Sequence, residues 1–453
     1  MTSNTIKSFS VYGLFGTNNV HIDFEENIKI LIGENGLGKT QVLNLFYYTL
    51  TGDFFRLNDF SFDKLVLKLA NEEPIEITKQ NIANLFEETF KNPLAKDIID
   101  DIGFAQFETL RNKFLSLKGD WSLFERYLIS TNRKSRNYSV HKLFRFFEEA
   151  SQPNLFDSTL NSSNLKFQKF KAKISKSLDK TDIMYFPTFR RVEQDLYNLG
   201  YNENELDINQ EDNLIQFGMH DVQKRFNTIQ NTIDKFLKEG LAQFTKDILS
   251  VVIEAPEQME SVFDKITEND MEIILSRVGD LLPTTQKKAV KEIVSQKQFK
   301  NHLSAYLLQK LIDIYEKQKG LDNAVKVFRD VCNKYLIDKK VFYDESGIKI
   351  FIKSDLTGDE ILLKNLSSGE KQIISIFSKI YLSEETKKFI ILFDEPELSL
   401  SMLWQRQLLP DIVKSKKCDF MLVVTHSPFI FENELDKYAV GLNEYITTPT
   451  VLS

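Results

Sequence analysis

One short segment constrains the fold of this chain more than any other, the run Gly33-Glu34-Asn35-Gly36-Leu37-Gly38-Lys39-Thr40. It follows the segment 28–32, which is apolar apart from Lys29 and is predicted as a short buried strand, and it precedes a predicted helix at 41–50. Glycines let successive backbone N–H groups curl around phosphate groups, and the helix N-terminus adds a dipole that favours an anion. A loop of this kind between a strand and a helix predicts an α/β fold with a phosphate-binding site.

Two side chains of this loop can bind different parts of a phosphorylated ligand and its metal. Lys39 can reach the outer phosphates, and the Thr40 hydroxyl can hold Mg²⁺. We predict that the remaining contacts to the ligand come from Gly33, Asn35, Gly36, Gly38 and Gln41.

A second segment, near the C-terminus, brings two carboxylates to the end of an apolar run. Residues 389–393 are all apolar and lead into Asp394 and Glu395. A buried parallel strand that ends in two carboxylates suits a Mg²⁺ site together with a base for an attacking water. We therefore predict Asp394 as a metal ligand and Glu395 as the catalytic base.

Two further segments accompany these. The run Leu366-Ser367-Ser368-Gly369-Glu370-Lys371-Gln372 leads into a helical pattern at 373–382, and the predicted strand 420–424 ends in Thr425-His426. A lone histidine after a strand is usually structural. His426 stands at the tip of the next predicted strand, 31 residues after Glu395. That position favours a catalytic role.

The run 366–372 resembles the LSGGQ-type signature of ABC ATPases, in the form found in the SMC, RecF and related chromosome and defence branches. The resemblance implies ATP hydrolysis with Mg²⁺, an ABC-type ATPase head with a mixed sheet, and a homo-oligomer built from head-to-tail dimers. In that family the signature of one subunit contacts the nucleotide on the other, a role that would fall to Ser367, Ser368, Gly369 and Glu370. Segment 396–400 would be the D-loop, and His426 the switch histidine.

The domain organisation follows from the spacing of these motifs. Lys39 and Ser367 lie 328 positions apart, which implies a large helical insertion between them. We predict an ATPase lobe with the P-loop at 1–90, a mainly helical insertion at 91–340 with a short core strand near 183–186, and a C-terminal ATPase part at 341–453. Within the insertion, the apolar seam 222–236 could pair with a second seam at 303–314, or both could pack in one helical core.

Two expectations remain open. The family places a glutamine after the strand that corresponds to 183–186, and this sequence lacks it. Gln194 could replace the glutamine, whereas Arg190 and Arg191 could face phosphates, a neighbouring subunit or a nucleic acid. Tyr12 or Phe15 could stack on adenine, although a core role for each is equally consistent with the sequence.

Charge and composition bear on the partners. The net charge is −7, yet residues 133–191 carry 13 Lys and Arg against 5 Asp and Glu, which is either a nucleic-acid patch or a solvated helix surface. Cys332 and Cys418 fit neither a disulfide framework nor a zinc site, so we expect a reducing compartment and a cytoplasmic location. No apolar run reaches the length of a membrane span, and we expect no membrane partner.

A narrower resemblance concerns the biological role. The segments 187–191 (Pro-Thr-Phe-Arg-Arg), 367–370 and 394–397 are similar to those of ATPase subunits in bacterial anti-phage systems, above all the AriA component of PARIS and then the PtuA component of Septu. This implies a sensor or scaffold that binds and releases a separate effector, of the TOPRIM nuclease type, in response to a phage-encoded trigger protein. The 27 residues after His426 are too few for a nuclease domain, so we expect the effector to be another chain. The alternative is a RecF- or SMC-like repair ATPase that binds duplex DNA through 133–191.

Overall fold

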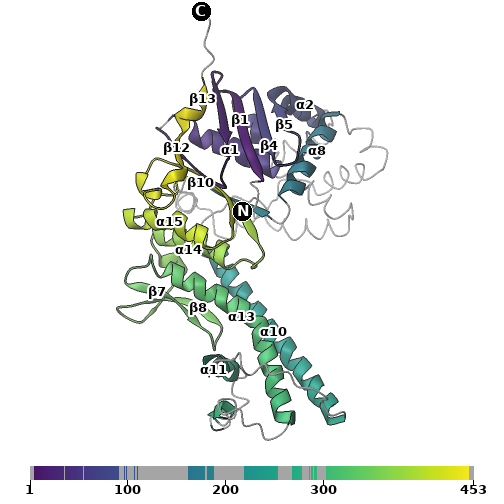
Figure 1. Cartoon of the computed structure of the whole chain (residues 1–453), viewed down its shortest axis with the longest axis vertical. Coiled ribbons are helices and arrows are strands. Elements are labelled where there is room, and N and C mark those ends of the chain that lie inside the picture. The colour runs from purple at the N-terminus through teal and green to yellow at the C-terminus, as the bar shows by residue number, and fades with distance from the viewer. Residues whose placement is uncertain are drawn as a thin grey trace, which may run out of the picture. The chain divides into compact units, whose positions relative to one another are not determined.

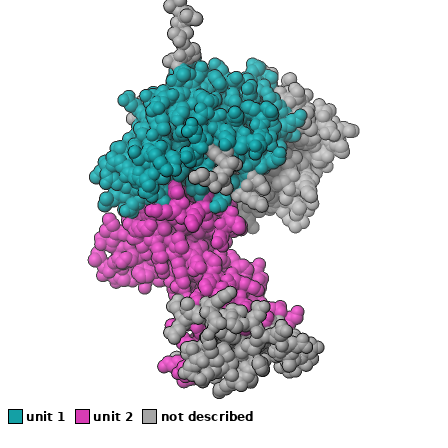
Figure 2. Space-filling model, viewed as in Figure 1, with its two compact units in different colours: residues 1–215, 388–410, 418–453 teal, residues 216–387, 411–417 magenta. Residues whose placement is uncertain are grey.

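The computed structural model describes residues 5–90 apart from 35 and 55, then 162–178, 181–187, 219–253, 268–277 and 302–447, with a few single positions between them. The chain forms two compact units, coloured separately in Figure 2. Unit 1 comprises residues 1–215, 388–410 and 418–453, and unit 2 comprises 216–387 and 411–417.

Unit 1 contains an antiparallel sheet in the order β13-β2-β1-β4-β5. Apolar and polar residues alternate along much of these strands, so that one face is buried. A left-handed residue, Asn71, lies in the turn between β4 and β5. The strands are β1 (Ile6–Leu14), β2 (Asn18–Asp23), β4 (Lys64–Leu69), β5 (Ile75–Thr78) and β13 (Ile446–Thr447).

The second sheet of unit 1 is parallel and positions the site. Its order is β12-β3-β11-β10-β6, with β3 (Ile28–Ile32), β6 (Thr181–Phe186), β10 (Lys388–Asp394), β11 (Cys418–Thr425) and β12 (Ala439–Gly441). The two central strands, β10 and β11, are almost continuously apolar because both of their faces are covered. Asp394 pairs with Val424, and Val424 pairs with Leu31, so the carboxyl ends of β3, β10 and β11 meet at one edge.

Helix α1 (Lys39–Thr51) contributes to a core shared by both sheets of unit 1. Phe46 of α1 lies 5.0 Å from Phe9 of β1 and 6.1 Å from Phe420 of β11, measured between ring centroids. Helices α2 (Lys79–Phe90) and α8 (Ser162–Ser177) belong to the same unit, and Phe167 and Ile174 of α8 are buried in this core. Helix α1, which follows the loop at 33–38, is thereby anchored in the core of unit 1.

Unit 2 is built on helices. Helices α10 (Met219–Ile253), α13 (His302–Cys332) and α14 (Ser368–Tyr381) pack against one another, and the short α11 (Glu268–Arg277) packs on α13 (Figure 1). A three-stranded antiparallel sheet joins them, in the order β7-β8-β9. Its strands are β7 (Lys339–Asp344), β8 (Lys349–Ser354) and β9 (Glu360–Ile361).

The two predicted apolar seams are seen in part. Val222, Phe226, Ile229 and Ile233 of α10 are buried, whereas Phe236, the last residue of the predicted seam, is 36% exposed. Phe226 meets Phe328 of α13 with ring centroids 5.6 Å apart. Further along the pair, a Cβ at Gly240 would lie 2.7 Å from Ile314, so the helices approach closely there. The side chains of Leu303 and Leu307 lie outside the described residues.

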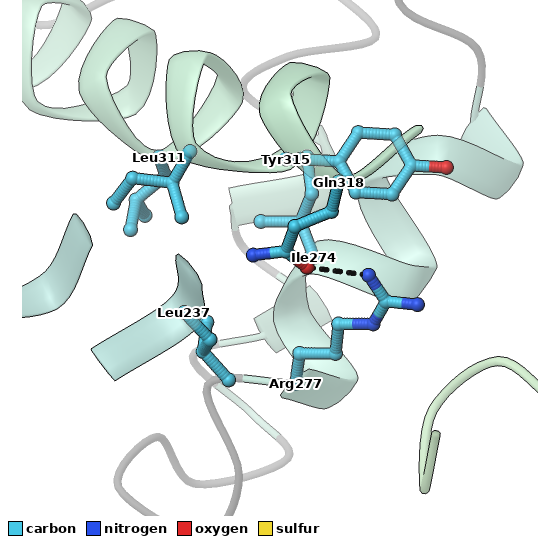
Figure 3. A pocket seen from close by; sticks show the side chains of 7 residues that line it. Leu237, Ile274, Arg277, Leu311, Tyr315 and Gln318 are labelled. Atoms are coloured by element: carbon cyan, nitrogen blue, oxygen red, sulfur yellow. Dashed lines mark hydrogen bonds between the residues drawn. The ribbon is translucent and has the colours of Figure 1, made fainter. Parts of the chain in front are cut away.

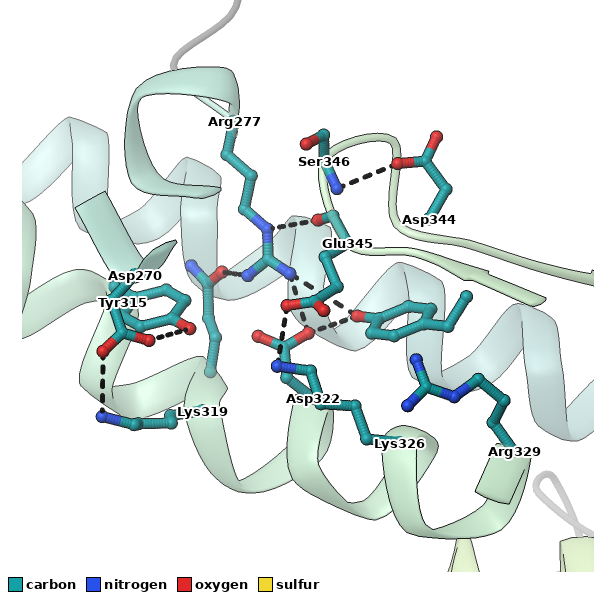
Figure 4. A network of polar contacts seen from close by, with 12 residues as sticks. Asp270, Arg277, Tyr315, Lys319, Asp322, Lys326, Arg329, Asp344, Glu345 and Ser346 are labelled. Atoms are coloured by element: carbon teal, nitrogen blue, oxygen red, sulfur yellow. Dashed lines mark hydrogen bonds and ion pairs between the residues drawn. The ribbon is translucent and has the colours of Figure 1, made fainter. Parts of the chain in front are cut away.

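A buried polar network connects α11, α13 and the β7–β8 hairpin (Figure 4). Arg277 donates to Asp322 at 2.7 Å, to Gln318 at 2.6 Å and to the backbone oxygen of Glu345 at 2.9 Å. The Tyr343 hydroxyl also donates to Asp322. Burial by itself lowers the pKa of Arg277, but the hydrogen bond and charge of Asp322 outweigh it and the pKa is raised. Beside this network lies a small, largely apolar cavity (Figure 3).

Helix α15 (Met402–Lys414) follows the second carboxylate segment. Short 3-10 helices complete the described chain at Arg56–Asp59, Leu363–Asn365, Pro428–Ile430, Asp436–Tyr438 and Leu442–Tyr445. The predicted α/β fold is confirmed, with an antiparallel and a parallel sheet in the unit that contains the loop at 33–40.

Candidate functional site

The loop between β3 and α1 has the backbone of a phosphate-binding loop. Gly36 and Gly38 both have left-handed backbones, with φ of 89° and 84°. At Gly38 a Cβ would lie 2.8 Å from the Phe15 ring, whereas at Gly36 it would meet nothing within 4 Å. Gly38 is therefore required by conformation and by space, while the loop at Gly36 stays open to a ligand.

Lys39 lies at the centre of the site. Its side chain is buried, and its ammonium donates to the backbone oxygens of Gly33 and of Glu34, the latter at 3.0 Å. It also lies 2.8 Å from Nε2 of His426. Burial lowers the pKa of Lys39, and the charges of Glu395, Asp394 and Glu397 oppose that effect only in part.

Thr40 and Asp394, the two residues predicted to hold a metal, lie next to each other. The Thr40 hydroxyl donates to Oδ1 of Asp394 at 3.0 Å, across 354 positions of sequence. Asp394 is buried at the end of β10, and Thr40 is in the first turn of α1. One hydroxyl and one carboxylate, both oxygen donors, thus face the same point beside the loop.

Glu395 and His426 form the third part of the site. Oε1 of Glu395 lies 3.2 Å from Nε2 of His426, and both side chains are partly exposed, at 20% and 31%. The imidazole therefore stands between the Lys39 ammonium and the Glu395 carboxylate. Nε2 can accept from Lys39 in one tautomer or donate to Glu395 in the other.

The residues fit ATP and Mg²⁺. The open loop with left-handed glycines, the buried lysine and the hydroxyl–carboxylate pair are the groups that phosphates and their metal require. Within the described residues there is no cluster of three or more His, Cys, Asp or Glu that could hold a metal alone. Mg²⁺ is commonly held by one or two protein oxygens together with substrate phosphates and water.

The signature segment lies in unit 2, whereas the P-loop and the carboxylates lie in unit 1. Ser367 caps α14, where its hydroxyl accepts from the N–H of Glu370 at 3.4 Å and its own N–H donates to Glu370 at 2.8 Å. Ser368 is exposed in the first turn, and Gly369 is buried beside it. The cap leaves a helix N-terminus whose exposed residues are Ser367 and Ser368.

Lys339 was not anticipated from the sequence. Its ammonium lies 3.0 Å from Oε1 of Glu370 and offsets a negative charge at the start of the signature helix. Burial by itself raises the pKa of Glu370, but the N–H of Ser367 and the ammonium of Lys339 outweigh it and lower the pKa. Lys339 and Glu370 are 31 positions apart on different elements, so no local pattern could have paired them.

The other predicted residues have different outcomes. Phe15, 48% exposed, lies against the P-loop at Gly38, while Tyr12 carries the ammonium of Lys64 over its ring at 4.7 Å. Gln41 lies in the first turn of α1. Asn35, Arg190, Arg191 and Gln194 lie outside the described residues, as does most of 133–191.

Comparison with known proteins adds the following. The model of the AAA ATPase domain family (AAA_15) matches residues 5–431. No protein of curated function matches the chain. Two similar solved structures are an SmcHead bound to the C-winged helix domain of ScpA, and an Smc head domain with an extended coiled coil bound to the C-terminal domain of ScpA, derived from Pyrococcus furiosus. Both matches have a TM-score of 0.37 and cover 94% of this chain. The first structure is 10% identical in sequence, and the match covers 90% of its chain. The second is 12% identical, and the match covers 91% of its chain.

No described helix is both long enough and apolar enough to span a membrane.

Proposed function

The chain belongs to the AAA ATPase domain family, and from that premise we propose that it binds ATP with Mg²⁺ and hydrolyses the terminal phosphate. The observation that carries the proposal is the meeting of Lys39, Thr40, Asp394, Glu395 and His426 at the carboxyl ends of β3, β10 and β11. These groups come from segments up to 387 positions apart, and each lies within 3.3 Å of another.

The proposed mechanism assigns one task to each group. Lys39 holds the outer phosphates through its ammonium, while Thr40 and Asp394 would hold Mg²⁺, which when bound neutralises charge on the phosphates. Glu395 orients the attacking water and takes its proton. His426 lies beside both Glu395 and Lys39, where its imidazole can donate a hydrogen bond to a terminal phosphate.

The test of this proposal is Lys39→Ala in the full chain. We expect ATP binding to be lost, because the loop then has no cation for the outer phosphates. Binding of a fluorescent ATP analogue and release of phosphate are measured together, and Lys29→Ala, on β3, is the control. If Lys39→Ala binds and hydrolyses ATP like the unchanged chain, the assignment of this loop is wrong.

We also propose that the site is completed by a second copy, whose Ser367, Ser368, Gly369 and Glu370 would contact the nucleotide. The support is the capped N-terminus of α14, since two exposed serines at a helix N-terminus suit a terminal phosphate. Phe15, beside Gly38, is the proposed platform for adenine, with Tyr12 as the alternative.

The proposed biological role is that of an ATPase subunit in anti-phage defence, as sensor and scaffold for a separate nuclease effector. It is supported by the resemblance of segments 187–191, 367–370 and 394–397 to AriA-type and PtuA-type subunits. The test is a pull-down of the tagged chain, expressed with its neighbouring gene, followed by a native mass measurement with ATP and Mg²⁺. A stoichiometric nuclease-like partner is the expected result. Recovery of the chain alone would count against this role.

One observation favours a second candidate, a repair ATPase that binds duplex DNA. Helix α8 carries five lysines and no acidic residue, although the whole chain is acidic. Four of the five are exposed, namely Lys166, Lys169, Lys171 and Lys176. If this helix binds phosphates, DNA should stimulate ATP turnover with a strong salt dependence, and replacing the exposed Lys166, Lys169 and Lys171 by Gln should reduce the salt slope by about three.

A further inference from the structure

The segment after the catalytic carboxylates contains a buried acid that the proposed mechanism does not use. Glu397 is 9% exposed, and its Oε1 accepts three hydrogen bonds. The donors are the Thr425 hydroxyl at 2.7 Å, the N–H of His426 at 2.9 Å and the N–H of Ser427 at 3.1 Å. One carboxylate oxygen therefore holds three consecutive residues at the end of β11.

These contacts fix the backbone from which the His426 side chain departs. Beyond the end of a strand, backbone N–H groups lose their ladder partners and need others. Glu397 supplies that partner to His426 and Ser427, and hydrogen bonds to a charged acceptor are stronger than those to a neutral one. The imidazole that departs from this backbone lies 2.8 Å from the Lys39 ammonium and 3.2 Å from the Glu395 carboxylate.

A second connection ties the same residues to helix α15. The side-chain amide of Gln405 donates to the backbone oxygen of Leu400 at 2.9 Å and to that of Glu397 at 3.3 Å. Its Oε1 accepts from the Ser427 hydroxyl at 2.6 Å. Segment 396–400 includes the left-handed residue Ser399 (φ 67°). The side chains of Glu397 and Gln405 thus link this segment to residues 425–427.

The other oxygen of Glu397 distinguishes this acid from a packing residue. Its Oε2 is buried and has no hydrogen-bond partner in the described part of the chain. Buried polar atoms rarely lack a hydrogen-bond partner. If Glu397 served packing alone, an apolar side chain could take its place without leaving a buried oxygen unpaired. The carboxylate also acts electrostatically on Lys39.

We propose that Glu397 is a positioning residue that couples segment 396–400 to His426. This inference rests on the ATP hydrolysis proposed above. Because segment 396–400 follows the catalytic base directly, a movement of this segment would displace Glu397 and turn His426. Glu397 acts through the histidine and does not itself touch the reacting atoms.

The first experiment measures kcat and KM for ATP in Glu397→Ala, Glu397→Gln and Gln405→Met. In Glu397→Ala we expect kcat to fall about tenfold or more while KM changes less than about threefold, because an interaction that serves the chemical step is lost. Glu397→Gln should recover most of the rate, since its amide oxygen can accept from the same donors. Glu25→Gln, exposed after β2, is the control and should leave both constants unchanged.

The second experiment separates coupling through His426 from general stabilisation. In a His426→Ala background, Glu397→Ala should reduce kcat no further, because its effect passes through the imidazole. Independent, additive losses would overturn the proposal. If Glu397→Ala does not fold, Gln405→Met is compared instead in the unchanged chain and in His426→Ala. It should lower kcat in the first and not in the second, by a smaller factor than Glu397→Ala.

A third measurement does not depend on turnover. Hydrogen exchange of the peptide covering His426 and Ser427 should become at least about tenfold faster in Glu397→Ala, while the exchange of β3 stays unchanged. Unchanged exchange at His426 and Ser427 would refute the coupling. The unchanged chain could lack ATP turnover while hydrogen exchange at His426 and Ser427 is still faster in Glu397→Ala. That result would support the positioning role of Glu397 and contradict the proposed ATP hydrolysis.

Discussion

Glu395 has a left-handed backbone, with φ of 51°, directly after β10. A non-glycine residue in this region is strained by about 1–3 kcal/mol and persists only where its surroundings hold it. Here its N–H donates to the oxygen of Val424 at 2.8 Å. The strained turn directs the carboxylate toward His426 and away from the strand that precedes it.

The proposed base is tested by Glu395→Gln. Water would lose its proton acceptor while Thr40 and Asp394 still hold Mg²⁺, so ATP should bind normally and its turnover should fall by about a hundredfold or more. Bound nucleotide is identified after rapid gel filtration, and phosphate release gives the rate. Normal turnover in this variant would show that another group activates the water.

The sequence predicted the site residues whose positions are fixed by neighbouring residues in the chain. Lys39 and Thr40 follow from the loop, and Asp394 and Glu395 from the end of an apolar run, because a strand and a turn fix such positions over a few residues. The partners of Glu397 and Glu370 lie about 30 positions away. No period or motif encodes those distances, so only the folded chain reveals them.

At the scale of elements, the signature helix begins with a negative charge that needs a partner. Glu370 closes the capping box with Ser367, and Lys339 of β7 neutralises its carboxylate. A carboxyl group whose pKa is lowered by folding stabilises the native state above its unfolded pKa. That contribution is lost as the pH falls through the lowered, native value.

Lys339→Met should therefore shift acid unfolding. Without the ammonium the pKa of Glu370 rises toward its unfolded value, so less stability is present at neutral pH and its loss is complete at a higher pH than in the unchanged chain. Circular dichroism between pH 7 and about pH 3 brackets the ordinary pKa of a glutamate, about 4.3. The neighbouring Lys340→Met removes an exposed lysine paired with Asp355 and should leave the acid transition in place.

Arg277 and Asp322 form a buried ion pair in unit 2, with the two side chains 2.7 Å apart. Their side chains are 2% and 0% exposed. Arg277→Met should cost about 3–5 kcal/mol of unfolding free energy, because Asp322 is left buried without its cation. The double change Arg277→Met with Asp322→Leu should cost less, since no charge then remains buried.

Urea unfolding of the full chain measures both losses. Lys235→Met serves as the control, because Lys235 pairs with Glu239 at 3.7 Å on the exposed surface of α10 and such pairs contribute about 0.3–0.5 kcal/mol. Equal losses for Arg277→Met and Lys235→Met would mean that the buried network does not hold α11 to α13.

The elements themselves were largely predictable. Short, mostly apolar segments predicted the buried strands β3, β10 and β11. The spacing of Val222 to Phe236 predicted the apolar seam of α10, which is buried as far as Ile233 but not at Phe236. The sequence did not reveal that α13 meets α10 through Phe328, since a helix seam does not say which other seam it faces. The polar network around Arg277 was not predicted from the sequence either, because charged and polar residues of helices are mostly exposed.

At the scale of the whole molecule, the division of the motifs between two units is the central feature. The P-loop, both carboxylates and His426 belong to unit 1, while the signature belongs to unit 2. We propose that a complete site takes the first set from one copy and the signature from another. In a closed head-to-tail pair each copy then contributes to two sites.

Mixing two inactive variants tests this arrangement. Lys39→Ala removes the P-loop lysine, and Ser368→Glu places a negative charge at an exposed first-turn position of α14, where it repels phosphate without disturbing the helix. Each variant alone should be inactive. In a mixed pair, one site contains both changes and the other contains neither, so random pairing of equal amounts should restore about a quarter of the ATP turnover of the unchanged chain. If each chain completed its own site, mixing would restore nothing, and the head-to-tail dimer would have to be abandoned.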